Sequence, residues 1–159
     1  MVLYGMLRIS KMTDYAIQLM VSLYAAEQLQ AGSTLSALKL AERTHLETPT
    51  VSKVMKLLCR QKLVKSARGA HGGYFLANSG ADISVAEIIA AIEGPIAMTE
   101  CSIDDGVCGQ QPMCDLSTNW RQISAAVATA LAAVSLAEMA VPAVNARHIS
   151  GLQITTQNS

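Results

Sequence analysis

The stretch TPTVSKVMKLLCRQKLVKSARGAHGGYFLA, residues 48–77, decides the fold of this 159-residue chain. Its first part predicts a helix from Thr48, as N-cap, to about Gln61, with Pro49 at the first helical position. The apolar residues of this helix fall on one side at 100° per residue: Val51, Val54, Met55 and Leu58. We therefore expect that side to pack on the helices that precede it.

The opposite side of the same helix carries three basic residues, Lys53, Lys56 and Arg60, here called the cationic face. An α-helix fits the major groove of B-DNA, where lysine and arginine contact phosphates and base edges. A solvated basic face with no partner is the alternative, and by itself it would be the simpler interpretation. The predicted DNA contacts of this helix and of the segment after it are Thr48, Thr50, Ser52, Lys53, Lys56, Arg60, Arg68, His71, Gly72 and Gly73.

The second part of the stretch predicts a β-hairpin, with strands at residues 63–67 and 74–77. The intervening RGAHGG supplies glycines for a turn. A hairpin directly after such a helix is typical of a winged helix-turn-helix. Arg68 and His71 then lie near the wing tip, where a minor groove or a phosphate would lie. For His71 alone, a solvent-exposed loop residue is the alternative.

Two further helices are expected before this stretch. Ser10 is the candidate N-cap of the first, which runs to about Leu29, and Ser36 caps the second, residues 37–43. A connection of about four residues, 44–47, then leads into the third helix, which is helix-turn-helix spacing. The fold class is therefore mainly α, with a two-stranded wing.

After the wing, Ser84 caps a helix over residues 85–93, and a long alanine-rich helix spans about 118–134. Because no other segment of the chain is free to cover this long helix, we expect it to form a dimer interface. Packing inside its own subunit is the alternative. The expected organisation is a DNA-binding head at 1–82, a helix and cluster-binding loop at 83–117, a dimerisation helix at 118–141 and a disordered tail at 142–159.

The charge distribution is asymmetric although the net charge is zero. Residues 30–75 hold eight Lys and Arg against two acidic residues, and residues 76–159 hold eight acidic residues against two Arg. A basic half predicts an anionic partner. We find no signal-peptide pattern and no good membrane span, so the expected location is the cytoplasm, without a membrane partner.

Three of the four cysteines lie in ECSIDDGVCGQQPMCDLSTNW, residues 100–120, here called the cysteine loop. Six residues separate Cys101 from Cys108, and five separate Cys108 from Cys114. Three soft thiolates in a loop of this composition suit a thiophilic metal or an iron–sulfur cluster. Inert surface cysteines, or a disulfide with a spare thiol, are the alternatives. No catalytic constellation or phosphate loop is found, which predicts that the chain is not an enzyme and has no small-molecule substrate.

Several motifs occur in the order found in a known family: SKMTDYAIQLM (10–20), TPTVSKVMKLL (48–58), RGAHGGYFLA (68–77), AEIIAAIEGP (86–95) and the cysteine loop. Over residues 6–141 the chain resembles the Rrf-type winged-helix iron–sulfur regulators, the IscR and NsrR group. RGAHGGY and IEGPIAMTEC are most similar to the regulator of the SUF iron–sulfur assembly operon. The resemblance implies a homodimeric repressor whose affinity for operator DNA depends on a bound cluster.

The resemblance also implies that Cys101, Cys108 and Cys114 are the cluster ligands. IscR-like members place a histidine three residues after the last cysteine, where this chain has Ser117. NsrR-like members instead use an aspartate in a T-D-Y setting of the partner's first helix, which makes Asp14 the preferred fourth ligand. A first-turn carboxylate that stabilises its own helix is the alternative role of Asp14.

Several alternatives stay open at this stage. Because this chain has Ser117 in place of the histidine of IscR-like members, the cluster type is undecided, with 2Fe–2S preferred to 4Fe–4S. Glu100, Asp115 or an exogenous ligand could complete the site. The chain could also be a nitric-oxide or redox sensor or a zinc-stabilised regulator of the same fold. A cluster carrier or adaptor protein is a further class, against which the cationic face argues.

Overall fold

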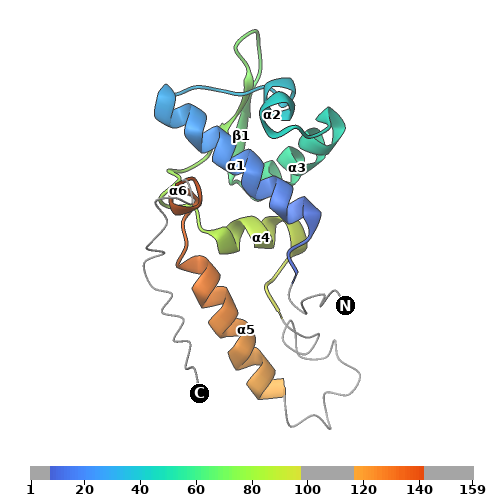
Figure 1. Ribbon diagram of the computed structural model, residues 1–159, viewed down its shortest axis with the longest axis vertical. Coiled ribbons are helices and arrows are strands. Elements are labelled where there is room, and N and C mark those ends of the chain that lie inside the picture. The colour runs from blue at the N-terminus through green and yellow to red at the C-terminus, as the bar shows by residue number, and fades with distance from the viewer. Residues whose placement is uncertain (1–7, 98–116, 142–159) are drawn as a thin grey trace, which may run out of the picture. The chain divides into compact units, whose positions relative to one another are not determined.

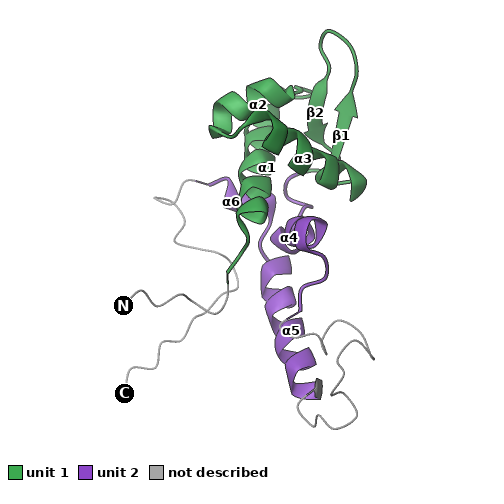
Figure 2. Ribbon diagram, turned by 90° about the vertical axis from the view of Figure 1, so that its right-hand side faces the viewer, with its two compact units in different colours: residues 1–79 green, residues 80–159 purple. Residues whose placement is uncertain are grey.

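The computed structural model of the chain describes residues 8–97 and 117–141 (Figure 1). It divides into two units, residues 1–79 and 80–159 (Figure 2). The first unit holds helices α1 to α3 and strands β1 and β2, and the second holds α4 to α6. The two strands form one antiparallel sheet, so the predicted fold class, mainly α with a two-stranded wing, is confirmed.

Helices α1 (Lys11–Leu29) and α2 (Ala37–Thr44) both begin at the predicted serine caps. Ser10 Oγ accepts a hydrogen bond from the amide three residues later at 3.2 Å, and Ser36 Oγ does the same at 3.2 Å. Each serine thereby satisfies one of the amides that a helix N-terminus leaves without a partner. The caps fix where both helices start.

The turn between α2 and α3 is one residue shorter than predicted, because Thr44 is still helical. His45 follows with a left-handed backbone, φ 56°, and its amide donates to the Ala41 carbonyl. The Leu46 amide donates to that same carbonyl at 3.2 Å. Both bonds go to the Ala41 carbonyl in the last turn of α2, and the left-handed backbone of His45 turns the chain toward α3.

Helix α3 (Thr48–Arg60) begins one residue earlier than predicted, so Thr48 as its N-cap is wrong. The N-cap is Glu47, whose carbonyl accepts from the Val51 amide at 3.0 Å and which makes no side-chain cap hydrogen bond. Thr48 therefore already has helical geometry, and Pro49 lies in the first turn, where its missing N–H costs no hydrogen bond. The helix also ends one residue before the expected Gln61.

The apolar side of α3 forms the centre of the first unit's core. Its members are fully buried, as the helical periodicity predicted: Val51, Val54, Met55 and Leu58. The helix contacts α1, α2 and β1. Burial of such side chains contributes about 1.5–3 kcal/mol each, so this face holds the three helices together.

The wing consists of β1 (Val64–Ala67) paired with β2 (Gly73–Leu76), in the register Lys65 opposite Phe75. Both predicted strands are present, with shifts of one residue at their ends. A third segment, not predicted, joins this sheet as a single bridge between Leu35 and Tyr74. The Leu35 amide donates to the Tyr74 carbonyl at 3.0 Å, and the Tyr74 amide donates back at 2.8 Å. The segment before α2 is thereby attached to the wing.

Gly73 is required by this bridge. A Cβ atom at residue 73 would lie 2.7 Å from the backbone carbon and oxygen of Leu35, closer than real Cβ atoms approach. We expect Gly73→Ala to break the bridge and to lower the free energy of unfolding by about 1–3 kcal/mol, the range for a lost buried hydrogen bond or comparable strain. Gly32→Ala is a poor control, because the backbone of Gly32 has φ +76°, which strains any residue with a side chain. The control is therefore Ala70→Gly, which changes one methyl group in the same wing loop. Urea denaturation of the three proteins measures the effect, and equal stability of Gly73→Ala and wild type would contradict it.

The second unit is organised around α4 (Val85–Glu93), which has the predicted bounds and the predicted N-cap, Ser84. A capping box closes its start, since Ser84 Oγ accepts from the Glu87 amide while the Glu87 carboxylate accepts from the Ser84 amide at 2.8 Å. Four buried side chains of α4 face the unit's core: Val85, Ile88, Ile89 and Ala91.

Helices α5 (Ser117–Ala132) and α6 (Leu136–Met139) complete the second unit. The chain between them is tied to the start of α4, because the Val85 amide donates to the Val134 carbonyl at 2.9 Å. Along α5 itself, most side chains are exposed or half-buried, and Ile123 is 44% exposed. In the part of the chain that the structure describes, no helix has both the length and the apolar character needed to cross a bilayer.

Candidate nucleic-acid interface

The cationic face of α3 is fully presented to solvent. Lys53, Lys56 and Arg60 are all exposed, while the side of the helix opposite them is buried. Their spacing of three and four residues aligns them along one face of a 13-residue helix. Because the buried side anchors α3, these three cations project from a rigid element, which is the arrangement that enters a major groove.

The start of α3 carries three polar residues that are also predicted DNA contacts. Thr48 and Ser52 are exposed and Thr50 is half-buried, and the first turn holds no acidic residue. Hydroxyl groups and the partial positive charge of a helix N-terminus both favour phosphate oxygens. Three further predicted contacts therefore lie at the start of the recognition helix, and their binding to DNA is a prediction.

The wing loop, residues 68–72, presents Arg68 and His71, both exposed. Gly72 and Gly73 are half-buried, and their tight packing supplies a structural reason for both glycines. A Cβ at Gly72 would lie 2.5 Å from the Ala67 carbonyl oxygen. Direct DNA contact by the two glycines stays a prediction, whereas Arg68 and His71 have the exposure that such contact requires.

The proposed cluster ligands are only partly described. Cys101, Cys108 and Cys114 lie outside the described residues. Asp14 lies in the first turn of α1, is exposed, and accepts a hydrogen bond from Gln18 Nε2 at 2.8 Å. Within residues 8–97 and 117–141, no group of three or more His, Cys, Asp and Glu could hold a metal ion.

The fourth cysteine, Cys59, belongs to α3 and not to the cysteine loop. It is half-buried, and burial raises the pKa of its thiol. A thiol that resists deprotonation is a poor nucleophile and metal ligand. Cys59 is thus a small, half-buried side chain next to the buried side of the helix.

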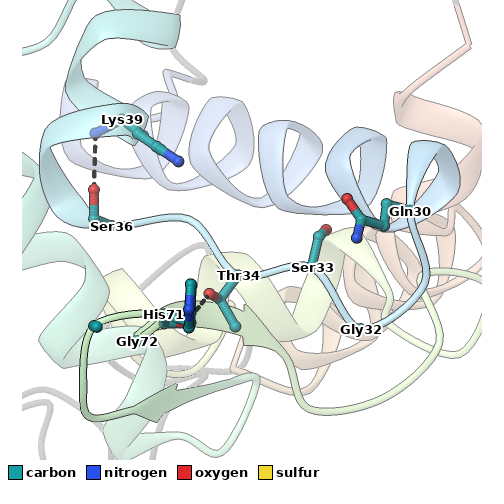
Figure 3. A pocket seen from close by; sticks show the side chains of 9 residues that line it. Gln30, Gly32, Ser33, Thr34, Ser36, Lys39, His71 and Gly72 are labelled. Carbon is teal, nitrogen blue, oxygen red and sulfur yellow. Dashed lines mark hydrogen bonds between the residues drawn. The ribbon is translucent and has the colours of Figure 1, made fainter.

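One pocket next to the wing was not predicted from the sequence. It has a volume of about 470 Å³ and lies between the segment before α2, the first turn of α2 and the wing loop (Figure 3). We call it the turn pocket. Its lining comes from residues 30–39 and 70–72, which are distant along the chain, so no local sequence pattern predicts it.

Residues 9–142 match the family model Rrf2, described as an iron-dependent transcriptional regulator. The match includes α1 to α6 and the cysteine loop. The chain belongs to the Rrf2 family. It is therefore a helix-turn-helix transcriptional regulator and not an enzyme.

Individual Rrf2 relatives agree with this assignment. A protein named as an HTH-type transcriptional regulator in Mycobacterium tuberculosis (strain ATCC 25618 / H37Rv) is 30% identical over 138 residues, 84% of this chain and 81% of that protein. IscR of Xenorhabdus nematophila is 30% identical over 100 residues, 63% of this chain and 60% of that protein. The solved structure of T. potens IscR superposes with a TM-score of 0.63 and 28% identity, covering 84% and 85% of the two chains.

Proposed function

We propose that this Rrf2 regulator binds operator DNA as a homodimer and represses a SUF-type iron–sulfur assembly operon according to whether an iron–sulfur cluster is bound. The exposed cationic face of α3 carries the DNA-binding half of the proposal. Similarity to IscR proteins and the three clustered cysteines support the sensing half. The SUF target rests on the motifs RGAHGGY and IEGPIAMTEC alone.

The donor set fits such a cluster. Cys101, Cys108 and Cys114 would supply three thiolates, and Asp14 of the partner subunit would supply a carboxylate from the first turn of α1, where this residue is exposed. When bound, the cluster supplies a centre that is labile to oxidants and to loss of iron. A carboxylate oxygen is a harder and weaker ligand than a thiolate. We therefore expect the iron bound by Asp14 to be the one that oxidants attack first. We prefer a 2Fe–2S cluster.

The dimer is proposed to form through α5. In the single chain Trp120, Val127 and Leu131 are only half-buried, and Ile123 is 44% exposed. A second copy of α5 would remove this apolar surface from water. Such burial would stabilise the dimer by about 25 cal/mol per Å² of apolar surface. Two recognition helices carried by one dimer can then meet half-sites about one DNA turn apart.

The cluster site is tested by purifying Cys101→Ala under anaerobic conditions and recording visible absorption and iron content. We expect it to lose both, because two thiolates and a carboxylate do not suffice to retain a cluster. Asp14→Ala should keep the absorption anaerobically and lose it faster than wild type in air.

The matched control is Cys59→Ala, which removes the thiol that lies outside the cysteine loop and should leave absorption and iron unchanged. A Cys101→Ala protein that keeps its colour and iron would contradict the assignment of ligands. A colourless wild-type protein with one zinc per chain would instead indicate a zinc-stabilised regulator of the same fold.

A further inference from the structure

The backbone that carries Asp14 is fixed at the start of α1. The Asp14 amide donates to the Ser10 carbonyl at 3.0 Å, and the amide of the preceding residue, Thr13, donates to Ser10 Oγ at 3.2 Å. Thr13 itself is 0% exposed, so it anchors this first turn in the core of the head. Because the cap and the buried threonine hold the backbone, the direction of the Asp14 carboxylate depends on its side-chain torsions alone.

The side chain of Asp14 is held by Gln18, one helical turn farther along α1. Gln18 Nε2 donates a hydrogen bond to Asp14 Oδ2 at 2.8 Å, and both side chains are exposed. Residues four positions apart lie next to each other on the surface of a helix, which is why the pair can meet. An exposed aspartate otherwise changes between staggered rotamers, so this hydrogen bond favours one of them. A carboxylate accepts several bonds, and one bond to Oδ2 leaves Oδ1 able to bind a metal ion.

The donor in this pair is a neutral amide. A lysine or arginine at residue 18 would also orient the carboxylate, but its positive charge would offset the negative charge that a metal ligand provides. Gln18 orients Asp14 and leaves that charge in place. In metal sites, the groups that hydrogen-bond to a ligating side chain fix its orientation, and their loss weakens metal binding about 10- to 100-fold. Stabilisation of α1 by the pair is the alternative role.

We infer that Gln18 is a positioning residue of the proposed cluster site, which holds the Asp14 carboxylate in the orientation that completes the cluster of the partner subunit. The inference rests on the proposed function and on Asp14 as the fourth ligand. Gln18 acts through Asp14 and is not itself a ligand. Because the three cysteines supply the other ligands, Gln18 governs how fast the cluster is lost and not whether it forms.

The test measures the decay of visible absorption after anaerobically purified, full-length protein is exposed to air. Gln18→Met keeps a long, unbranched side chain and removes the donor, and it should lose absorption about 10-fold faster than wild type. Gln18→Lys restores a donor at the same position and should return the rate toward that of wild type. The matched control is Gln28→Met, the same change at an exposed position near the other end of α1, which should decay like wild type.

The double variant Asp14→Ala/Gln18→Met distinguishes a positioning role from stabilisation of the helix. If Gln18 acts through Asp14, the double variant should lose its cluster no faster than Asp14→Ala alone, because the group that Gln18 orients is already gone. A further increase of about 10-fold would overturn the inference, since Gln18 would then act by another route. The cluster-free forms of Gln18→Met and wild type should have equal melting temperatures, and a lower value for the variant would favour the stabilising role.

Failure of this inference is distinguishable from failure of the proposed function. If anaerobic wild-type protein has neither colour nor iron, the proposed sensing function fails. If Asp14→Ala accelerates cluster loss while Gln18→Met decays like wild type, only the positioning role of Gln18 is overturned. If Asp14→Ala itself decays like wild type, the inference fails together with Asp14 as the fourth ligand, and the assignment of the three cysteines stands.

Discussion

Replacing the three cations of the cationic face, in the variant Lys53→Ala/Lys56→Ala/Arg60→Ala, is expected to weaken operator binding about 100- to 1000-fold at physiological salt. Each lysine or arginine that contacts a phosphate releases counterions, and a base contact adds about 1–3 kcal/mol of discrimination. The slope of log affinity against log salt should fall by about 3 if all three contact phosphates. Fluorescence anisotropy with labelled DNA from upstream of its own operon measures both quantities.

A control variant distinguishes the loss of a DNA-contacting surface from the loss of net positive charge. All three side chains are exposed, so their removal leaves the buried side of α3 intact, and circular dichroism should confirm an unchanged fold. The control is Lys11→Ala/Arg43→Ala, which removes two exposed charges from α1 and α2. If the control loses as much affinity as the triple variant, the effect is one of net charge. A triple variant that binds like wild type would show that α3 is not the recognition helix.

Truncating the core at Leu58 is expected to have the largest effect on stability. Leu58→Ala should lower the free energy of unfolding by about 2–5 kcal/mol, because it removes buried methyl groups and leaves a cavity that the surroundings only partly fill. Leu58 is 0% exposed and lies on the side of α3 that forms the core with α1 and α2. Such a loss is a large part of the 5–15 kcal/mol that stabilises a typical domain.

Leu38→Ala is the matched control for this truncation. Leu38 is 60% exposed on α2, so the same deletion of atoms should change stability by less than about 0.5 kcal/mol. Urea denaturation followed by circular dichroism compares both variants with wild type. Similar losses at Leu38 and Leu58 would mean that the burial described for α3 does not hold in solution.

The main elements could be predicted because their signals are local. The side of α3 that is buried follows from residues three and four positions apart, and the starts of α1, α2 and α4 follow from the serine caps. For α4 the predicted end, residue 93, is also the observed one. The wing followed from two short β-forming runs separated by glycines.

The features that escaped prediction depend on contacts between distant parts of the chain. The bridge of Leu35 to Tyr74 joins segments 39 residues apart, and the turn pocket is lined by residues 30–39 together with residues 70–72. The capping error at Thr48 has a different origin. Either Glu47 or Thr48 could be the N-cap of a helix with proline in its first turn. The residue types alone do not determine which of the two it is, because the choice depends on the backbone geometry.

For the cluster site, the sequence indicates donors but not their arrangement. The spacing of Cys101, Cys108 and Cys114 points to a shared ligand. The fourth ligand is expected from another subunit, which no pattern along one chain can position. Asp14 satisfies the one condition that can be examined in a single chain, an exposed carboxylate.

The most direct test of the central claim, that a bound cluster controls DNA affinity, uses one anaerobic preparation of the full-length protein. Its affinity for the DNA upstream of its own operon is measured before and after removal of iron with a chelator, with visible absorption recorded on the same samples. We predict that absorption disappears and that affinity changes about 5- to 150-fold, the usual range of coupling between two sites. Equal affinity of the coloured and colourless forms would contradict the claim.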